Sequence, residues 1–483
     1  MAWPRSIARR YPTFGSVLVL LALVAGCSSV VNGKATSIYS DPNTVAGLRV
    51  SNGPSGPRPN VAKTDLPVQG GTDDKVDEIA ANAVADVQTY WKEMYPKLFN
   101  APFEPVEKVV SYDSTAKSGS KVCGTSTTGF MNAFYCEGDD LIAWDRGKLL
   151  PIIQDRFTPM GVVTVLAHEY GHAVQHHSKI NPKTTPSIVL EQQADCFGGA
   201  FLRWVAEGKA EHFTLNTSGG LNTVLATTVA VRDKTGSDPS ARRAHGSAFD
   251  RVSAFQFGFT DGPARCVAIN ADEVAARIQK LPSQFTGGSD TGELPVTEQN
   301  IQHVVQSLKE SFQANHVPEP AVSFQGSATC ADAKATPPVS YCPAANTLTV
   351  DVAGLAERAK KPGDDDDTSA LPSSINGDFS AYVLLASRYT LSVQKGLGAS
   401  ITGEIVGLRS ACYAGGYAAA TTSNGASLQL SPGDLDEAVS GLLSDGLAAS
   451  DVNGKEAPSG FTRVQAFRTG VLDGTAACAA VYS

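Results

Sequence analysis

Residues 161–177 read GVVTVLAHEYGHAVQHH, and this stretch predicts a helix that begins after Thr158 and Pro159. Threonine is a common helix-capping residue, and proline is favoured at the first helical position. Within this helix His168 and His172 are four residues apart, so both imidazoles lie on one face and can reach a single metal ion. The alternative is a packed helix whose histidines make only structural hydrogen bonds.

A second helix, expected to start at Thr185 and Pro186, carries Glu191 and Asp195 at the same four-residue spacing. A catalytic zinc site needs three protein ligands and one open position for water. Glu191 can complete that set with the two histidines, and Asp195 can accept a hydrogen bond from the distal N–H of a ligand histidine. The two helices therefore predict one zinc ion per chain.

Three further groups bear on the chemistry of this site. Glu169, next to the first histidine, is the expected general base: zinc lowers the pKa of bound water toward about 7, and Glu169 passes the water proton to the leaving amine. His245, in a His-Gly-Ser sequence, is either an oxyanion stabiliser or a loop residue with a structural hydrogen bond. His176 and His177 are interpreted as a solvated or packed helix end rather than as metal ligands.

The motifs together resemble those of the bacterial neutral zinc metallopeptidase family. The resemblance rests on HEYGHAVQHH, LEQQADCFGGAF and HGSAFDRVSAFQFGF in this order, with a CG…FYC segment before them, and covers residues 75–268. It implies zinc and peptide-bond hydrolysis, with His168, His172 and Glu191 as ligands and Glu169 as base. The chain differs from the family pattern in carrying a predicted lipid anchor and a second copy of the domain.

Nine cysteines are present, and eight of them fall into two sets of four with similar spacing. The residues around them also agree. The matching segments are FYCEGDDLIAWD (134–145) with SYCPAANTLTVD (340–351), ADCFGGAF (194–201) with SACYAGGY (410–417), and RVSAFQFGFTDGPARC (251–266) with RVQAFRTGVLDGTAAC (463–478). An amphipathic helical pattern precedes each set, near 75–95 and 297–314. Because the matches keep the same order, they predict an internal duplication.

Apart from Cys27, which is assigned a separate function below, the chain has eight cysteines, and this even number predicts four disulfides in a protein outside the cytoplasm. If the two halves share a fold, each half has three possible pairings of its four cysteines. Cys123 and Cys136 bracket a Gly/Ser/Thr-rich stretch before a strand-like run, so we expect them to pair across that hairpin or loop. This leaves Cys196 with Cys266. The repeat then predicts the pairs Cys330–Cys342 and Cys412–Cys478; free buried cysteines are the alternative.

The second half lacks every residue with a predicted chemical role. Alignment through the repeat puts Ser387, Arg388, Leu391, Gly407, Ala411 and Ala457 at the positions of His168, Glu169, His172, Glu191, Asp195 and His245. This half cannot hold zinc in the same way. It is expected to act as a covering wall, a substrate-recognition surface or a partner-docking surface.

The expected fold class is α+β, with two tandem related metallopeptidase-like domains, each with long helices and a short disulfide-stapled β segment. The expected boundaries are a lipoprotein signal peptide (1–26), a flexible tether (27–72), a catalytic domain (73–285) and a degenerate domain (292–483), with a Pro/Gly/Ser/Thr stretch (281–295) between the halves. An acidic run at 364–367 is interpreted as solvated rather than cation-binding.

The amino terminus predicts a membrane-anchored location. Three arginines precede an apolar run too short to span a bilayer, and this run ends in Val-Ala-Gly before Cys27, as in the bacterial lipobox. Cys27 is therefore the expected lipid anchor, on the outer side of a bacterial cell membrane; an ordinary secretory signal is the alternative. The composition excludes a disordered or polytopic membrane protein, and a net charge of −9 without a basic segment argues against nucleic-acid binding.

The predicted function is a cell-envelope lipoprotein zinc metallopeptidase, more specifically an endopeptidase. Its expected partner is a peptide or protein substrate that adds to an edge of sheet, and a protein partner can dock on the second half. A non-catalytic, zinc-stabilised binding or assembly lipoprotein is the alternative, and Glu169 discriminates against it because zinc binding does not need this residue. A solute-capturing lipoprotein of a transporter shares only the anchor.

Overall fold

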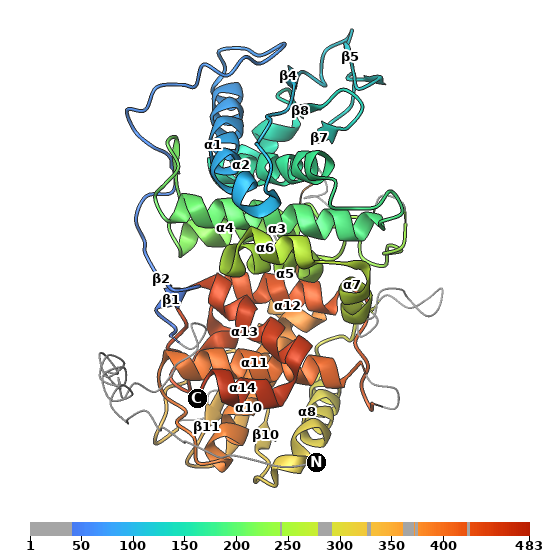
Figure 1. Ribbon diagram of the computed structural model, residues 1–483. Coiled ribbons are helices and arrows are strands. Elements are labelled where there is room, and N and C mark those ends of the chain that lie inside the picture. The colour runs from blue at the N-terminus through green and yellow to red at the C-terminus, as the bar shows by residue number, and fades with distance from the viewer. Residues whose placement is uncertain are drawn as a thin grey trace, which may run out of the picture. The chain divides into compact units, whose positions relative to one another are not determined.

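Helices dominate the computed structural model, and short strands form small separate sheets (Figure 1). The structure describes residues 41–241, 244–278, 292–325, 330–360, 371, 375–422 and 426–483. Cys27, the signal peptide, most of the predicted linker and the acidic run at 364–367 lie outside these residues. Within the described part of the chain, every helix is too short or too polar to cross a bilayer.

Helices are the main elements of both halves of the described chain. In the first half these are α1 (Lys75–Phe99), α2 (Leu149–Ser178), α3 (Ser187–Ala206), α4 (Gly219–Ala230), α5 (Ala248–Asp261), α6 (Pro263–Ala268) and α7 (Ala271–Ile278). In the second half they are α8 (Glu298–Phe312), α9 (Val352–Ala359), α10 (Asp378–Gly396), α11 (Glu404–Ala420), α12 (Asp434–Ser444), α13 (Gly460–Asp473) and α14 (Thr475–Val481). The amphipathic helices expected near 75–95 and 297–314 are confirmed as α1 and α8.

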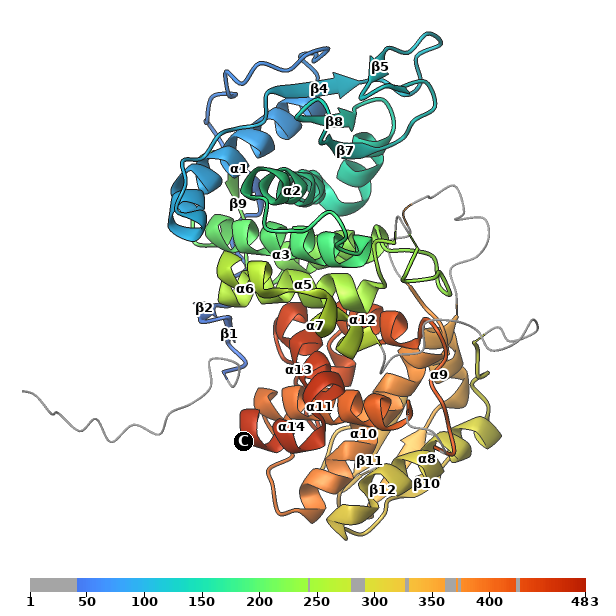
Figure 2. The same cartoon turned by 45° about the vertical axis from the view of Figure 1, so that its right-hand side comes forward.

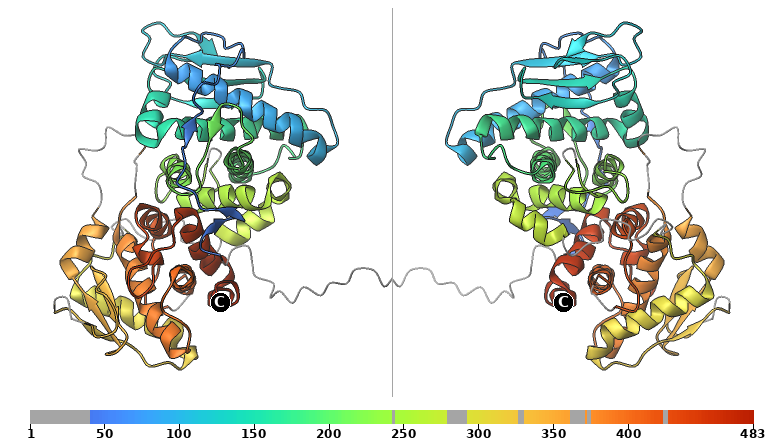
Figure 3. Two further views of the ribbon diagram at one scale, coloured as in Figure 1. Left: turned by 90° about the vertical axis from the view of Figure 1, so that its left-hand side faces the viewer. Right: turned by 90° about the vertical axis from the view of Figure 1, so that its right-hand side faces the viewer.

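Each half also holds one three-stranded sheet of the same topology. The first-half sheet has the order β4-β8-β7, from β4 (Lys108–Tyr112), β7 (Ala133–Cys136) and β8 (Leu141–Asp145). The second-half sheet has the order β10-β12-β11, from β10 (Ala321–Ser323), β11 (Val339–Cys342) and β12 (Thr347–Val350). In both, the central strand pairs parallel with the first strand and antiparallel with the other. The α+β class is thus confirmed. Figure 3 shows a sheet beside helices both in the first half, coloured blue to green, and in the second half, coloured yellow to red.

In each half, two central helices cross so closely that their backbones touch. A Cβ atom added to Gly258 of α5 would lie 1.7 Å from the carbonyl oxygen of Cys196 on α3. In the second half, a Cβ on Gly470 of α13 would lie 1.8 Å from the carbonyl oxygen of Cys412 on α11. Since no side chain fits at either point, glycine is required at both crossings. Figure 2 shows α3 running over α5.

The helical run that carries the two histidines begins where the sequence predicts, at Thr158 and Pro159. Helix α2 also contains a preceding helical run from Leu149, and the two runs are separated by non-helical backbone at Phe157 and Thr158. Thr158 has φ 59° and ψ 176°. The cause is Pro159, whose ring excludes the helical conformation from the preceding residue. The metal-binding segment is thus a separate helical run set off by a kink.

Part of the expected tether is held against the first half. Arg58 donates to the carbonyl oxygens of Ala210 (3.1 Å) and Phe213 (3.0 Å), and Val45 is fully buried. Three short strands lie in this segment: β1 (Thr44–Val45), β2 (Leu48–Arg49) and β3 (Gly56–Pro57). Strand β3 pairs with β9 (Phe213–Thr214). Outside the segment, β5 (Lys121–Val122) and β6 (Thr125–Ser126) form a separate hairpin. Residues 41–72 of the expected tether therefore include hydrogen bonds and buried side chains that contact the first half.

Contacts group Ile38–Ser483 as one unit, and hydrogen bonds join the two halves within it. Gln256 on α5 donates to the carbonyl oxygen of Phe461 on α13 at 2.9 Å. Asp436 on α12 accepts from the backbone N–H of Phe249 at 2.9 Å. The rings of Phe259 and Phe461 lie 5.0 Å apart. Helix α5 of the first half therefore packs against α12 and α13 of the second half.

Candidate metal centre

Helices α2 and α3 bring two histidines and one glutamate together. Nε2 of His168 lies 3.2 Å from Oε2 of Glu191, and Nε2 of His172 lies 3.5 Å from Oε1 of the same carboxylate. One ligand atom from each residue lies within 4.8 Å of the others. The four-residue spacing on α2 stacks the two imidazoles on the face toward α3, as the sequence predicts.

The second nitrogen of each histidine is held by a polar side chain. Nδ1 of His168 lies 2.7 Å from Oδ1 of Asp195, the arrangement that the sequence predicts. Nδ1 of His172 lies 3.0 Å from Oε1 of Gln175, whose amide in turn donates to the carbonyl oxygen of Leu190 at 2.6 Å. These contacts fix which nitrogen of each ring faces Glu191.

Arg251 on α5 supports this arrangement from the side opposite the ligands. Its Nε donates to Oδ2 of Asp195 at 2.9 Å, and one terminal nitrogen donates to Oδ1 at 2.7 Å. Both side chains are almost fully buried. The two hydrogen bonds from Arg251 therefore stabilise the Asp195 carboxylate in place of the water that it loses on burial. The sequence interpretation misses Arg251 and Gln175; the repeated RV…AF segment marks the position of Arg251 without revealing its partner.

The charges at the centre determine its protonation. Burial opposes ionisation of Glu191, but His172 and His168 outweigh it and hold the Glu191 pKa well below its usual range. Burial also opposes the charged form of His168, yet Asp195 and Glu191 raise its pKa to about 10. The Asp195 pKa is lowered because Arg251 and His168 outweigh burial. The ionised carboxylates of Glu191 and Asp195 therefore flank the two imidazoles and favour a cation bound beside them.

These residues fit a zinc ion. Both oxygens of the Glu191 carboxylate face imidazole nitrogens, and the other nitrogen of each ring already contacts Asp195 or Gln175. Nitrogen and carboxylate donors in a set of three match a catalytic zinc site, which keeps a position for water. His168, His172 and Glu191 would hold the ion, and Asp195 and Gln175 would orient the two rings.

Glu169 lies beside this centre and contacts the sheet. Its Oε2 accepts from the backbone N–H of Tyr135 on β7 at 3.1 Å. Burial raises the pKa of Glu169, and the two histidines partly offset this effect. A carboxylate with a raised pKa is better matched to taking and returning a proton near neutral pH.

A cavity of about 430 Å³ opens onto the centre. His168, Glu169 and Arg251 line it, together with Ala133 of β7. Leu371 also lines it, and this residue belongs to the second half. The cavity therefore joins the metal centre, the edge strand β7 and a residue from the second half.

The structure separates the remaining histidines from the ligand set. His245 lines the cavity, but its backbone N–H and its Nδ1 both contact the carboxylate of Asp233, at 2.7 and 3.1 Å. Nε2 of His177 lies 2.8 Å from Asp140, and Nδ1 of His176 lies 3.2 Å from Glu137. These contacts agree with the predicted packed helix end for His176 and His177.

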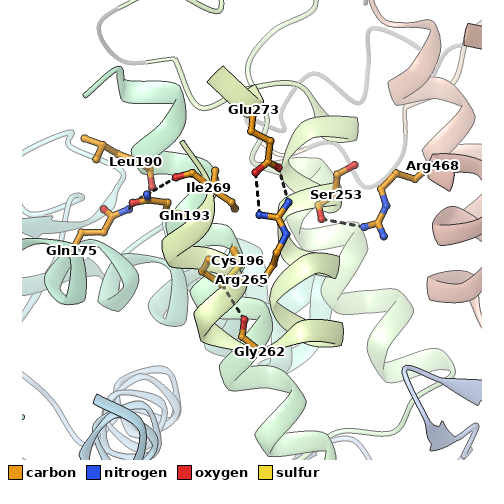
Figure 4. The surroundings of a disulfide bond; sticks show 11 residues. Gln175, Leu190, Gln193, Cys196, Ser253, Gly262, Arg265, Ile269, Glu273 and Arg468 are labelled. Carbon is orange, nitrogen blue, oxygen red and sulfur yellow. Dashed lines mark hydrogen bonds and ion pairs between the residues drawn. A yellow bond between two sulfur atoms is a disulfide. The ribbon is translucent and has the colours of Figure 1, made fainter. Parts of the chain in front are cut away.

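The cysteines pair as the sequence predicts. The structure contains the disulfides Cys123–Cys136, Cys196–Cys266, Cys330–Cys342 and Cys412–Cys478. Figure 4 shows the surroundings of the bond at Cys196, the residue that follows Asp195. There Gln193 donates to the carbonyl oxygen of Ile269 at 2.8 Å, and Arg468 of the second half donates to that of Ser253 at 3.2 Å. The disulfide at Cys196 and the hydrogen bond of Gln193 thus fix α3 beside Glu191 and Asp195.

In the second half, protein atoms fill the corresponding place. Arg388, at the position aligned with Glu169, is fully buried and donates to the carbonyl oxygen of Asp451 at 2.7 Å and to the hydroxyl of Ser450 at 2.7 Å. A Cβ on Gly407, aligned with Glu191, would lie 2.1 Å from the carbonyl oxygen of Ala449. The segment around residues 449–451 therefore packs where a metal centre would need space.

Two histidines and a glutamate on paired helices, with a glutamate after the first histidine, define the class of zinc metallopeptidases with an HExxH motif. A family model described as "putative neutral zinc metallopeptidase" matches residues 15–269, somewhat more than half of the chain. The chain belongs to this family. No curated protein and no solved structure matches it.

Proposed function

We propose that the protein is a zinc endopeptidase of the bacterial cell envelope, anchored through a lipid on Cys27 and facing outside the cytoplasm. Its first half would hold one zinc ion and hydrolyse peptide bonds. The observation that carries this proposal is Glu169, which is half-buried beside the donor set and lines the same cavity. A binding module that used zinc only for stability would have no need of a carboxylate at this position.

Each residue of the centre has a separate role in the proposed reaction. Zinc, when bound, supplies Lewis acidity and lowers the pKa of a water ligand. Glu169 accepts a proton from the attacking water and delivers it to the leaving amine. Asp195 and Gln175 hold the two imidazoles in one tautomer, and the Arg251 guanidinium keeps Asp195 ionised.

The substrate is proposed to bind along β7. This strand lies at the edge of its sheet, and residues 131–133 line the cavity. An extended peptide can pair with such an edge and place its scissile bond near Glu169. His245 also borders the cavity and remains a candidate for contact with the oxyanion.

The second half is proposed to be a degenerate duplicate that serves as a wall. Matching sheet topology, matching disulfides and the glycine crossings at Gly258 and Gly470 support duplication. The contribution of Leu371 to the cavity supports the wall function. The proposed domain boundaries remain 73–285 and 292–483.

The test compares the purified protein with its Glu169→Gln variant. We expect one zinc per chain in both, cleavage of unstructured peptides by the wild type, and a rate at least about 100-fold lower in the variant. Removal of zinc with a chelator should abolish cleavage, and added zinc should restore it. Bound zinc without cleavage across a broad peptide library would favour a non-catalytic binding lipoprotein; two zinc ions per chain would contradict the account of the second half.

A further inference from the structure

Two buried glutamines connect His172 to the chain beyond α6. Gln175 follows His172 on α2, and Gln193 lies on α3. Oε1 of Gln175 lies 3.0 Å from Nδ1 of His172, and Nε2 of Gln175 donates to Oε1 of Gln193 at 3.0 Å. Gln193 in turn donates to the carbonyl oxygen of Ile269, the residue that follows α6. Figure 4 shows both glutamines with Ile269. A chain of hydrogen bonds thus runs from a zinc-ligand position to residue 269.

Backbone carbonyl groups fix the orientation of both side-chain amides. Nε2 of Gln175 also donates to the carbonyl oxygen of Leu190 at 2.6 Å, and Nε2 of Gln193 donates to that of Ile269 at 2.8 Å. Because a carbonyl oxygen only accepts, the nitrogen of each amide must face it. Asn181 occupies the remaining positions of the Gln193 amide: its Nδ2 donates to Oε1 at 2.7 Å, and its Oδ1 accepts from Nε2 at 3.2 Å. Reversal of the Gln193 amide would therefore bring like groups together at Ile269 and at Gln175.

The amide orientation determines which nitrogen of His172 carries a hydrogen. With its nitrogen toward Leu190 and Gln193, Gln175 presents its oxygen to His172. An amide oxygen only accepts, so Nδ1 of the ring carries the hydrogen that this contact needs. Nε2, which lies 3.5 Å from Oε1 of Glu191, is then the nitrogen with a lone pair for a metal ion.

The half without the histidine has the opposite amide orientation. Gln394 aligns with Gln175 through the repeat, and Arg409 aligns with Gln193. Nε of Arg409 donates to Oε1 of Gln394 at 2.5 Å, and Nε2 of Gln394 donates to the hydroxyl of Ser410 at 2.8 Å. The glutamine of this half therefore turns its oxygen, rather than its nitrogen, toward the position that aligns with residue 193.

We propose that Gln193 is a positioning residue of the zinc site, and that it acts on His172 through the amide of Gln175. The inference rests on the zinc site of the proposed function and assigns a role to a residue that touches none of the ligands. An arginine at position 193 would point its N–H groups at the amide nitrogen of Gln175. Reversal of the Gln175 amide would relieve that contact, but it would set the amide oxygen against the carbonyl oxygen of Leu190 and leave His172 without its acceptor.

The test compares two substitutions that remove opposite halves of the Gln193 amide. Gln193→Arg can still donate to Ile269 but cannot accept from Gln175, whereas an ionised Gln193→Glu accepts from Gln175 but cannot donate to Ile269. Competition against a zinc chelator measures affinity in the full chain. We expect Gln193→Arg to lower zinc affinity by about 10- to 100-fold and Gln193→Glu to keep most of it. A residue that only tied α3 to Ile269 would give the reverse order.

Two further variants separate this effect from a general loss of stability. Arg409→Gln removes buried hydrogen bonds of the second half, including those to Ser400 and Tyr482, and should bind zinc like the wild type. Gln193→Met neither donates nor accepts and avoids the larger arginine, so it should bind zinc more weakly than Gln193→Glu. Equal zinc affinity in the methionine and glutamate variants would contradict the proposal.

A second measurement follows the ring itself. In ¹⁵N–¹H spectra of the zinc-loaded protein, the Nδ1 hydrogen of His172 should exchange slowly with water in the wild type and in Gln193→Glu, and faster in Gln193→Arg. Unchanged exchange and unchanged zinc affinity in the folded arginine variant would overturn the inference and leave the proposed function intact. The expected order of zinc affinities without any peptide cleavage by the wild type would instead support the inference and contradict the proposed function.

Discussion

Asp195 is the residue through which the zinc ligands depend on the rest of the fold. Its Oδ1 contacts both the ring of His168 and the Arg251 guanidinium, and its Oδ2 accepts from Nε of Arg251. The carboxylate is therefore both a hydrogen-bond acceptor for a ligand and half of a buried ion pair. Its loss changes the orientation of His168 and leaves a buried cation without its partner.

We predict that Asp195→Asn lowers zinc affinity by about 10- to 100-fold, because the amide accepts more weakly from Nδ1 and no longer balances Arg251. A competition titration against a zinc chelator measures this change. Asp261→Asn, on an exposed position of α5, is the control and should bind zinc like the wild type. Equal zinc affinity in the Asp195 variant would show that this carboxylate does not support the ligand.

At the scale of elements, the crossing of α3 and α5 determines where Glu191 lies relative to α2. Since the Cβ position at Gly258 overlaps the backbone of α3, any side chain there must separate the two helices. The separation would move Glu191 and Asp195 away from the histidines while leaving the helices themselves intact.

We predict that Gly258→Ala lowers the free energy of unfolding by about 3 kcal/mol and also weakens zinc binding. Chemical denaturation and zinc titration check the two effects. Gly219→Ala is the matched control, because its Cβ meets nothing within 4 Å at the start of α4. A variant as stable as the wild type would mean that the helices can separate at little cost.

Sequence patterns predict the helices of the site, but not the tertiary contacts that position these helices. The spacing of His168, His172 and Glu191 depends only on helical periodicity, and the structure brings these residues together. The contacts of residues 41–72 with the first half and the role of Arg251 depend on long-range hydrogen bonds such as that of Arg58 with Ala210. Such contacts leave no local periodicity, so a single sequence does not reveal them.

At the scale of the whole molecule, the second half contributes to the cavity of the first. The carbonyl oxygen of Leu371 accepts from Arg156 at 2.8 Å, and its side chain is 7% exposed. We predict that Leu371→Ala raises KM about tenfold for peptides with large apolar side chains and leaves kcat within about twofold. Steady-state kinetics test this, with Leu397→Ala as the control on an exposed leucine. A fall in kcat alone would argue against a binding role.

The contact between the halves should also respond to pH. Burial raises the pKa of Asp436 to about 6, although the N–H of Phe249 and the charge of Arg232 oppose this. A carboxyl with a raised folded-state pKa stabilises the protein fully below its unfolded pKa near 4, and this contribution disappears as pH rises through about 6.

We therefore predict that the wild type loses about 2–3 kcal/mol of unfolding free energy, relative to Asp436→Asn, between pH 4 and pH 8. Denaturation at both pH values measures it, with Glu298→Gln, at an exposed position in the first turn of α8, as a control of unaltered pH dependence. Parallel pH profiles for wild type and Asp436→Asn would contradict the assignment.

The buried Arg388 has a consequence for the history of the second half under the proposed duplication. Replacing it with glutamate would remove the hydrogen bonds that its guanidinium donates to Asp451 and Ser450, at a cost of about 1.5–3 kcal/mol per bond. A glutamate at Gly407 would in addition collide with the backbone at Ala449. Each single substitution toward such a centre is thus unfavourable on its own.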